Sequence, residues 1–167
     1  MSSRDAIIAE IPRLRRYARA LTGRADVADD LVQDTLERAL DKWHFWQRER
    51  DLRPWLFSIM HNLHVDGRRR ESRVEFHDDD DLLLPVQRAT QTDALEVRDL
   101  ERALTLLPLD QREVLLLIGL EEMSYAEVAR ALKIPQGTVM SRLSRARGRL
   151  KAVLAGESTP QLKVVKP

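Results

Sequence analysis

The chain has 167 residues, with 28 Lys and Arg against 27 Asp and Glu, no cysteine, and few aromatic residues. The absence of cysteine excludes a disulfide framework and a thiolate zinc site. The N-terminus lacks the apolar run of a signal peptide, and no apolar stretch approaches the roughly 18 residues of a membrane span. Abundant Leu, Ala, Arg and Glu favour an all-α fold, so we expect a helical cytoplasmic protein without direct membrane association.

Two amphipathic helices are predicted in the first 45 residues. Apolar residues at helical spacing from Ile7 to Leu21 indicate the first, which the "TG" at 22–23 is expected to end. The second lies in "ADVADDLVQDTLERALDKW", where an apolar stripe runs from Val32 to Trp43.

A third helix and an acidic linker follow. The helix runs through "RPWLFSIMHNLHVDGRRR", with Pro54 near its start, and we expect Gly67 to end or fray it. The next stretch has no sustained period, a run of four Asp and a proline. Residues 71–95 carry seven acidic residues against two arginines. We therefore predict a flexible acidic linker over residues 73–94.

The helical pattern resumes at Ala94. One face is indicated by Val97, Leu100, Leu104 and Leu107, and Pro108 closes the segment. The run "REVLLLIGL" predicts a helix that is nearly fully buried.

Two further helices are expected around a tight turn. Ser124 with Glu127 three residues later forms a capping box, which starts a helix through Leu132. "KIPQG" makes the turn, and a last helix runs from about Gln136 to Leu154. The predicted organisation is a helical domain at 1–72, the linker at 73–94, a helix-turn-helix domain at 95–156 and a flexible tail at 157–167.

The last helix has two unlike faces. At 100° per residue its apolar stripe is Val139, Leu143, Ala146 and Leu150. The opposite side carries Thr138, Ser141, Arg142, Arg145 and Arg149. Residues 124–151 hold seven Lys and Arg against one acidic residue. A short capped helix, a turn and a basic helix are typical of a DNA-reading helix-turn-helix, although a solvated cationic face is the alternative.

The second predicted helix carries an acidic stripe. Its members are Asp30, Asp34, Glu37 and Asp41. Carboxylates repel DNA and attract a basic protein surface, so we interpret the stripe as a protein-binding face. A plain solvated face is the alternative.

The third helix combines aromatic, amide and basic side chains. They are Trp55, His61, Asn62, His64, Arg68, Arg69 and Arg70. Such groups suit single-stranded nucleic acid, whose bases stack and expose their edges. The alternative is a core tryptophan beside a basic helix end, and for Trp55 itself the core role is favoured.

Metal and enzyme chemistry find little support in the sequence. His61 and His64 are three positions apart and Asp66 is close by, but the spacing places no third ligand beside the two histidines. The four Asp at 78–81 lack the interleaved Gly and Glu of a calcium-binding loop. No nucleophile–base pair or phosphate-binding glycine loop is present. We predict no metal, no cofactor and no catalysis.

Three segments in order resemble the extracytoplasmic-function (ECF) sigma factors of bacterial RNA polymerase. "ADDLVQDTLERAL" resembles the family's core-polymerase-binding helix, and "RPWLFSIMHNLHVDGRRR" resembles its promoter-melting helix. "LPLDQREVLLL" and "MSYAEVARALKIPQGTVMSRLSRARGRL" are similar to its C-terminal helix-turn-helix domain. The resemblance covers nearly the whole chain.

The resemblance implies roles for three residue sets. Core polymerase would be bound by Asp30, Gln33, Asp34, Glu37 and Asp41. The melted −10 element would be bound by Trp55, His61, Asn62, His64, Arg68, Arg69 and Arg70, with Asn62 near a flipped base. The duplex −35 element would be bound by Gln136, Thr138, Ser141, Arg142, Arg145 and Arg149. An anti-sigma factor is the further expected partner, and the free chain is expected to be monomeric.

Two positions depart from the family pattern. Met140 stands where Lys or Arg is usual, and Ile118 where Arg is common. Both departures would remove contacts to DNA and shift the −35 preference. A stand-alone helix-turn-helix regulator, or a sigma-like decoy that binds an anti-sigma factor without DNA, is the competing hypothesis.

Overall fold

The computed structural model describes residues 2–46, 51–74 and 92–156. These residues form seven α-helices and one short 3-10 helix, with no strand among them, which confirms the predicted all-α class. Most of the predicted linker and the whole tail at 157–167 lie outside the described residues. None of the described helices combines the length and the apolar character needed to cross a bilayer.

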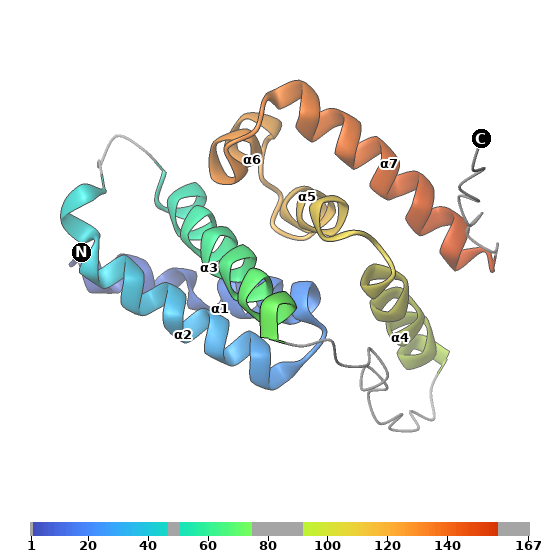
Figure 1. Ribbon diagram of the computed structural model, residues 1–167, viewed down its shortest axis with the longest axis horizontal. Coiled ribbons are helices and arrows are strands. Elements are labelled where there is room, and N and C mark those ends of the chain that lie inside the picture. The colour runs from blue at the N-terminus through green and yellow to red at the C-terminus, as the bar shows by residue number, and fades with distance from the viewer. Residues whose placement is uncertain (1, 47–50, 75–91, 157–167) are drawn as a thin grey trace.

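The N-terminal half packs three helices side by side (Figure 1). They are α1 (Ser3–Thr22), α2 (Ala25–Asp41) and α3 (Leu52–Val74), with the 3-10 helix η1 (Trp43–Phe45) after α2. A capping box between Ser2 and Asp5 begins α1, and Gly23 ends it in the left-handed conformation at φ 69°. The C-terminal end lies where the sequence predicts it, whereas the capping box at Ser2 is a start signal that the sequence analysis did not single out.

Two details of these helices differ from expectation. α3 does not end at Gly67 but continues to Val74. Gly67 is exposed, and an interior glycine costs a helix only about 1 kcal/mol, less than the buried side of α3 supplies. The apolar stripe was also predicted to include Trp43 in the second helix, but α2 ends at Asp41 and Trp43 lies in η1.

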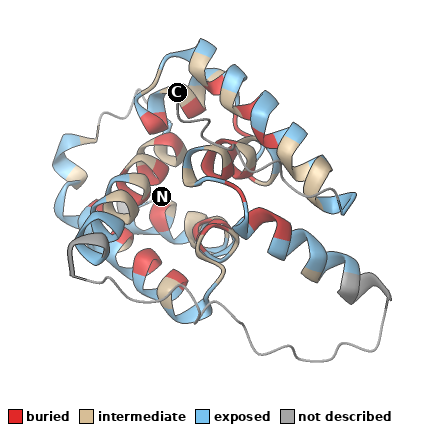
Figure 2. Cartoon of the chain, turned by 45° about the vertical axis from the view of Figure 1, so that its right-hand side comes forward, coloured by how far each residue is buried: buried red, intermediate tan, exposed pale blue. Residues whose placement is uncertain are grey.

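The C-terminal half is built from four helices. They are α4 (Thr92–Thr105), α5 (Leu109–Gly119), α6 (Tyr125–Leu132) and α7 (Gln136–Leu154). The apolar stripe predicted from Val97 to Leu107 is only half correct. Leu104 in α4 and Leu107 just after it are buried, whereas Val97 and Leu100 are 55% and 41% exposed. The C-terminal end of α4 packs against the rest of the molecule, while its outer end stays in solvent (Figure 2).

The helix-turn-helix forms as predicted. The side chain of Ser124 accepts from the backbone of Glu127, and α6 ends at Leu132, followed by Lys133 in the left-handed conformation at φ 55°. α7 then begins directly after Pro135. The helix α5 is largely buried, but two of its buried residues, Arg112 and Glu113, are charged.

The two halves pack against each other, an arrangement the sequence did not predict. α6 lies on α3, and both α4 and α5 contact α1. The buried apolar residues of the two halves, from Ile7 to Leu143, form one continuous cluster. Figure 2 shows buried segments facing one another across the junction. The core therefore runs through the contact between the halves.

Candidate polymerase and promoter interface

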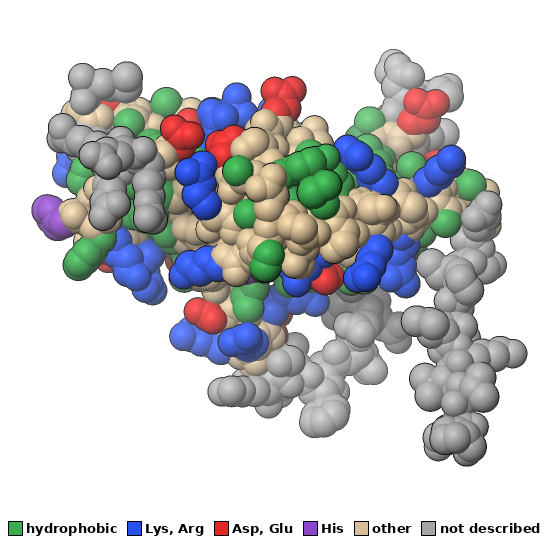
Figure 3. All heavy atoms as spheres, turned by 90° about the horizontal axis from the view of Figure 1, so that it is seen from above, with side chains coloured by type: hydrophobic (Ala, Val, Ile, Leu, Met, Phe, Trp, Pro, Cys, Tyr) green, Lys and Arg blue, Asp and Glu red, His purple; other side chains and the backbone are tan. Residues whose placement is uncertain are grey.

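The basic face of α7 is largely open to solvent. Val139, Leu143 and Ala146 are buried, and the side chains across the helix from them are exposed or half-buried. Gln136, Ser141 and Arg145 are exposed, while Thr138, Arg142 and Arg149 are half-buried. Figure 3 shows Lys and Arg side chains spread over the face of the molecule that is seen from above. The basic face of α7 can contact a duplex.

One arginine of this face has an acidic neighbour. Arg142 Nε lies 3.7 Å from Asp110 Oδ2 on α5. The pair is partly exposed, so solvent screens it and the interaction is weak. Arg142 can leave Asp110 for a phosphate at little cost.

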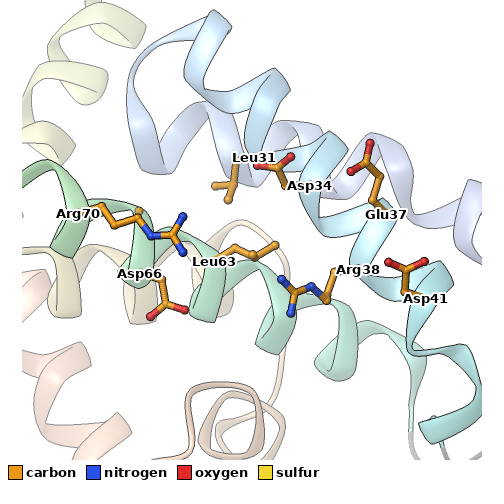
Figure 4. A pocket seen from close by; sticks show the side chains of 9 residues that line it. Leu31, Asp34, Glu37, Arg38, Asp41, Leu63, Asp66 and Arg70 are labelled. Atoms are coloured by element: carbon orange, nitrogen blue, oxygen red, sulfur yellow. The ribbon is translucent and has the colours of Figure 1, made fainter.

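The acidic stripe of α2 is exposed. Asp30, Gln33, Asp34, Glu37 and Asp41 all face solvent, as a protein-binding face requires. Beside the stripe lies a groove of about 400 Å³ between α2 and α3. Figure 4 shows Leu31 and Leu63 between the two helices and charged side chains around them.

The groove brings together residues that sequence reasoning assigned elsewhere or missed. Arg70 of α3 was predicted to bind the −10 element, Asp66 of α3 was considered only beside a metal site, and Arg38 of α2 was not singled out. The groove therefore joins an apolar floor to a rim of both charge signs, rather than the purely acidic surface that the stripe alone suggested. The groove forms where a face of α2 meets a face of α3. The periodicity of one helix does not show which face of another helix it meets, so no signal for the groove was present in the sequence.

The polar residues of α3 divide between two surfaces. Asn62, Arg68, Arg69 and Arg70 are exposed. His61 instead faces α5, where its Nδ1 lies 2.7 Å from Glu113 Oε1. His64 is half-buried with its Nε2 enclosed, and burial together with Arg68, Arg112 and His61 lowers its pKa to about 4. Only part of the predicted −10 set is thus presented to solvent in this arrangement.

Trp55 belongs to a cluster of three tryptophans. Its ring centroid lies 6.1 Å from that of Trp43 and 6.4 Å from that of Trp46. This packing agrees with the core role favoured for Trp55. Phe45 beside the cluster is 79% exposed and offers an aromatic face that the sequence analysis did not single out, although "KWHFW" is dense in aromatic residues.

Two family models match the halves of the chain. The sigma2 domain of PhyR matches residues 7–61, and region 4 of sigma-70 matches residues 98–150. The ECF RNA polymerase sigma factor EcfG of Rhodopseudomonas palustris is 43% identical over 92% of this chain and 85% of its own length. The chain belongs to the ECF RNA polymerase sigma factors. SigM of Bacillus subtilis, another member, is 32% identical over 83% of this chain and 86% of its own length.

Solved structures share the fold of this sigma factor. The sigma factor RpoE of Bartonella quintana, solved in complex with the anti-sigma factor NepR, matches with a TM-score of 0.74 and 33% identity. That match covers 93% of this chain and 98% of RpoE. CnrH, solved with the cytosolic domain of CnrY, matches with a TM-score of 0.67 and 26% identity over 91% of this chain and 86% of its own.

The two departures from the sigma-factor pattern have different surroundings. Met140 is 52% exposed on α7, where its apolar side chain reaches solvent in place of a cation. Ile118 packs against the hydrophobic core at the end of α5. Met140 can therefore face a bound duplex, whereas Ile118 contributes to packing.

The described residues hold no cluster of three or more His, Asp or Glu with metal-binding geometry. His61 contacts Glu113 of α5 instead, and His64 is surrounded by cationic groups. The four Asp at 78–81 lie outside the described residues.

Proposed function

We propose that this sigma factor uses three separate surfaces in promoter-dependent initiation. The exposed acidic side of α2 binds core RNA polymerase, α3 binds the melted −10 element, and α7 binds the duplex −35 element. The observation that carries the proposal is that α2 presents exposed acidic side chains, while α3 and α7 present exposed basic ones. A protein with a single DNA contact needs only one of them.

The α2 surface supports binding to a basic partner. Asp34, Glu37 and Asp41 lie both in the exposed stripe and on the rim of the groove. Charge complementarity steers such an association, and the apolar floor of Leu31 and Leu63 adds area for burial.

The α3 surface supports capture of an unpaired strand. The exposed amide of Asn62 can bond to a base edge, and the arginines at 68–70 can bind phosphates. Phe45 offers a ring on which a base can stack. Extruding a base costs a few kcal/mol of stacking, which these contacts would offset.

The α7 surface supports binding in a major groove. Arg145 is exposed and can bond a guanine edge with two hydrogen bonds, while Ser141 and Thr138 can reach phosphates. Binding through several arginines also implies affinity that falls steeply as salt rises.

An anti-sigma factor is part of the proposal. The relative RpoE was solved with such a protein, and the fold is shared over nearly the whole chain. We place the protein in the cytoplasm, where its polymerase lies, and assign it no catalysis of its own.

A decoy function is the second candidate, because the N-terminal half matches the sigma2 domain of PhyR, and PhyR of Bartonella quintana is described as an anti-anti-sigma factor. A decoy needs no DNA contacts, so the exposed arginine face of α7 favours the sigma-factor role.

The deciding experiment is transcription in vitro with purified core polymerase on fragmented genomic DNA, followed by mapping of transcript 5′ ends. Discrete start sites preceded by two shared elements at fixed spacing would support the proposal. Core binding without any stimulated transcript would favour the decoy. The same reaction without this protein is the control.

A further inference from the structure

The two halves of α7 carry different kinds of side chain. Residues 136–141 hold no ionisable side chain, whereas all five cations of the helix fall in residues 142–151. In a helix-turn-helix the N-terminal residues of the second helix contact base edges, while phosphates are bound mainly by Arg and Lys. Selection among bases therefore depends in large part on the uncharged N-terminal turns of α7.

Met140 is the apolar side chain that these turns expose. It is 52% exposed, although methionine is usually a buried residue. Val139, its neighbour in the sequence, is 0% exposed, so this turn of α7 is firmly packed on its other side. The exposure of Met140 therefore does not come from a frayed helix end. It is a feature of the face that can meet a duplex.

The surroundings of Met140 leave its side chain room to extend. Gly137 and Ser144, three positions before it and four positions after it, lie on the same side of the helix. Ser144 is exposed and short, and a side chain at Gly137 would meet no atom within 4 Å. A helical methionine extends toward the N-terminus of its helix. The thioether of Met140 is thus directed over Gly137, at the end of α7 that contacts bases.

A thioether has one well-matched partner in the major groove. It carries no hydrogen-bond donor and its sulfur is a weak acceptor, so it cannot replace the water on the polar edges of adenine, guanine and cytosine. The C5-methyl group of thymine is apolar, and contact with it buries both groups without leaving a polar atom unpaired. A Lys or Arg at this position would instead bind a phosphate or a guanine.

We propose that Met140 contacts the C5-methyl group of a thymine in the −35 element and thereby selects an A·T pair, in one orientation, at that position. The inference rests on the proposed function, because it deepens the role of α7 at the duplex element. Since the contact involves no charge, this selection does not depend on salt, unlike the affinity that the arginines supply.

The first test removes single methyl groups from the DNA. The holoenzyme is assembled from the full chain and core polymerase, and its promoter is taken from the mapped transcript 5′ ends. In synthetic promoter duplexes each thymine of the −35 element is replaced in turn by deoxyuridine, which pairs in the same way but lacks the C5-methyl group. Fluorescence anisotropy should show an affinity about fourfold lower for one of these duplexes, the change expected for one methyl-sized group withdrawn from an apolar contact.

The second test changes the side chain. Met140→Ala should bind the unmodified promoter about fourfold more weakly and lose the difference between thymine and deoxyuridine at that position. Met140→Leu, which keeps an apolar side chain of similar size, should retain the difference. Leu154→Ala, at a residue that is 50% exposed at the other end of α7, is the matched control and should retain it as well.

A cation at the same position gives a third readout. Met140→Arg should be insensitive to the methyl group. The slope of log affinity against log salt concentration should steepen by about 0.9, the value for one added phosphate contact.

Three results would overturn the inference. They are a promoter at which no deoxyuridine substitution changes the affinity, a methyl effect that persists in Met140→Ala, and a Met140→Ala variant whose only loss is in affinity for core polymerase. The last would assign the exposed side chain to a protein contact. In all three the proposed function survives, because transcription still starts at the mapped promoters.

The opposite failure is recognised separately. If core polymerase starts no transcript with this chain, the proposed function fails. The same deoxyuridine comparison is then made on duplexes that the chain alone selects from a random-sequence pool, and its outcome decides whether Met140 contacts thymine.

Discussion

The two basic helices, α7 and α3, differ in what determines which of their polar residues are exposed to solvent. In α7 the buried stripe of Val139, Leu143 and Ala146 is set by the helix's own periodicity, and the polar side is left open. In α3 the exposed Asn62 and the half-buried His61 are consecutive residues. One faces solvent, while the other contacts a helix more than 50 positions away.

This contrast shows where helical periodicity stops being informative. A helix on the outside of one bundle needs only two faces, and its sequence encodes both. A helix packed between two bundles has polar residues on its second buried side as well. Their partners, such as Glu113 for His61, come from distant sequence and leave no local pattern.

The sharpest way to break the contrast is to place a charge in the buried stripe of α7. Val139→Asp buries an unpaired carboxylate where the side chain is 0% exposed. The free energy of unfolding should fall by more than about 3 kcal/mol, measured by urea denaturation. Met140→Asp, one residue on and 52% exposed, should change it by no more than about 0.5 kcal/mol. Equal effects would show that α7 is not packed by this face.

The open side of α7 should carry DNA affinity without stability. Arg145→Ala should weaken binding to a duplex −35 element by about ten- to a hundredfold, the usual range for a lost base contact. Core binding should be unchanged. Fluorescence anisotropy with labelled duplex measures the effect, and Arg147→Ala, on another side of the same helix, is the control. Loss of core binding in Arg145→Ala would contradict the assignment of this face.

Reversing a charge on the acidic side of α2 should weaken binding to core polymerase and leave DNA binding unchanged. Asp34→Lys should weaken association with core polymerase about tenfold by charge reversal, and leave duplex binding intact. Biolayer interferometry with immobilised core measures it. Asp29→Lys, also exposed on α2 but roughly 100° round the helix from Asp30, is the control. Normal affinity for core in Asp34→Lys would exclude the stripe as the docking surface.

The enclosed side of α3 should show a smaller effect that depends on pH. The folded pKa of His64 is about 4 against an ordinary 6.5, so the unfolded chain binds the extra proton first as pH falls. Stability present above pH 6.5 is therefore lost progressively down to about pH 4. After discounting for the part of the ring that faces solvent, we expect about 1 kcal/mol between pH 7 and pH 5.

His64→Gln removes this titration and should flatten the pH dependence of urea denaturation by that amount. His44→Gln, at an exposed histidine in η1, is the control substitution. An unaltered slope in His64→Gln would show that the ring is solvated like a free histidine.

Much of the fold was predictable because its signals are local. The capping box at Ser124, the turn through Lys133 and the span of α7 all follow from residues within a few positions of one another. The same is true of the exposed acidic residues of α2. Three motifs at family spacing then identified the sigma-factor resemblance.

The remainder depended on contacts between distant segments. Arg16 gives no sign in the sequence that Glu121 is its partner, 105 residues later. One clue existed: Arg112 and Glu113 stand at the start of a helix expected to be buried, and buried charges require partners. The sequence could not show which residues those partners are. The predicted helix end at Gly67 was wrong for a similar reason, because packing along α3 outweighs the low helix propensity of one glycine.

The pair of Arg142 and Asp110 is a place where the DNA affinity of this chain can be adjusted by a small amount. With Asp110 3.7 Å away, part of the positive charge of Arg142 is already balanced before any phosphate arrives. Replacing Asp110 by a neutral residue would release that charge without altering any side chain that touches DNA. Transcription from all the promoters that this sigma factor recognises would then rise or fall together through one residue on α5. The order of preference among those promoters would stay the same.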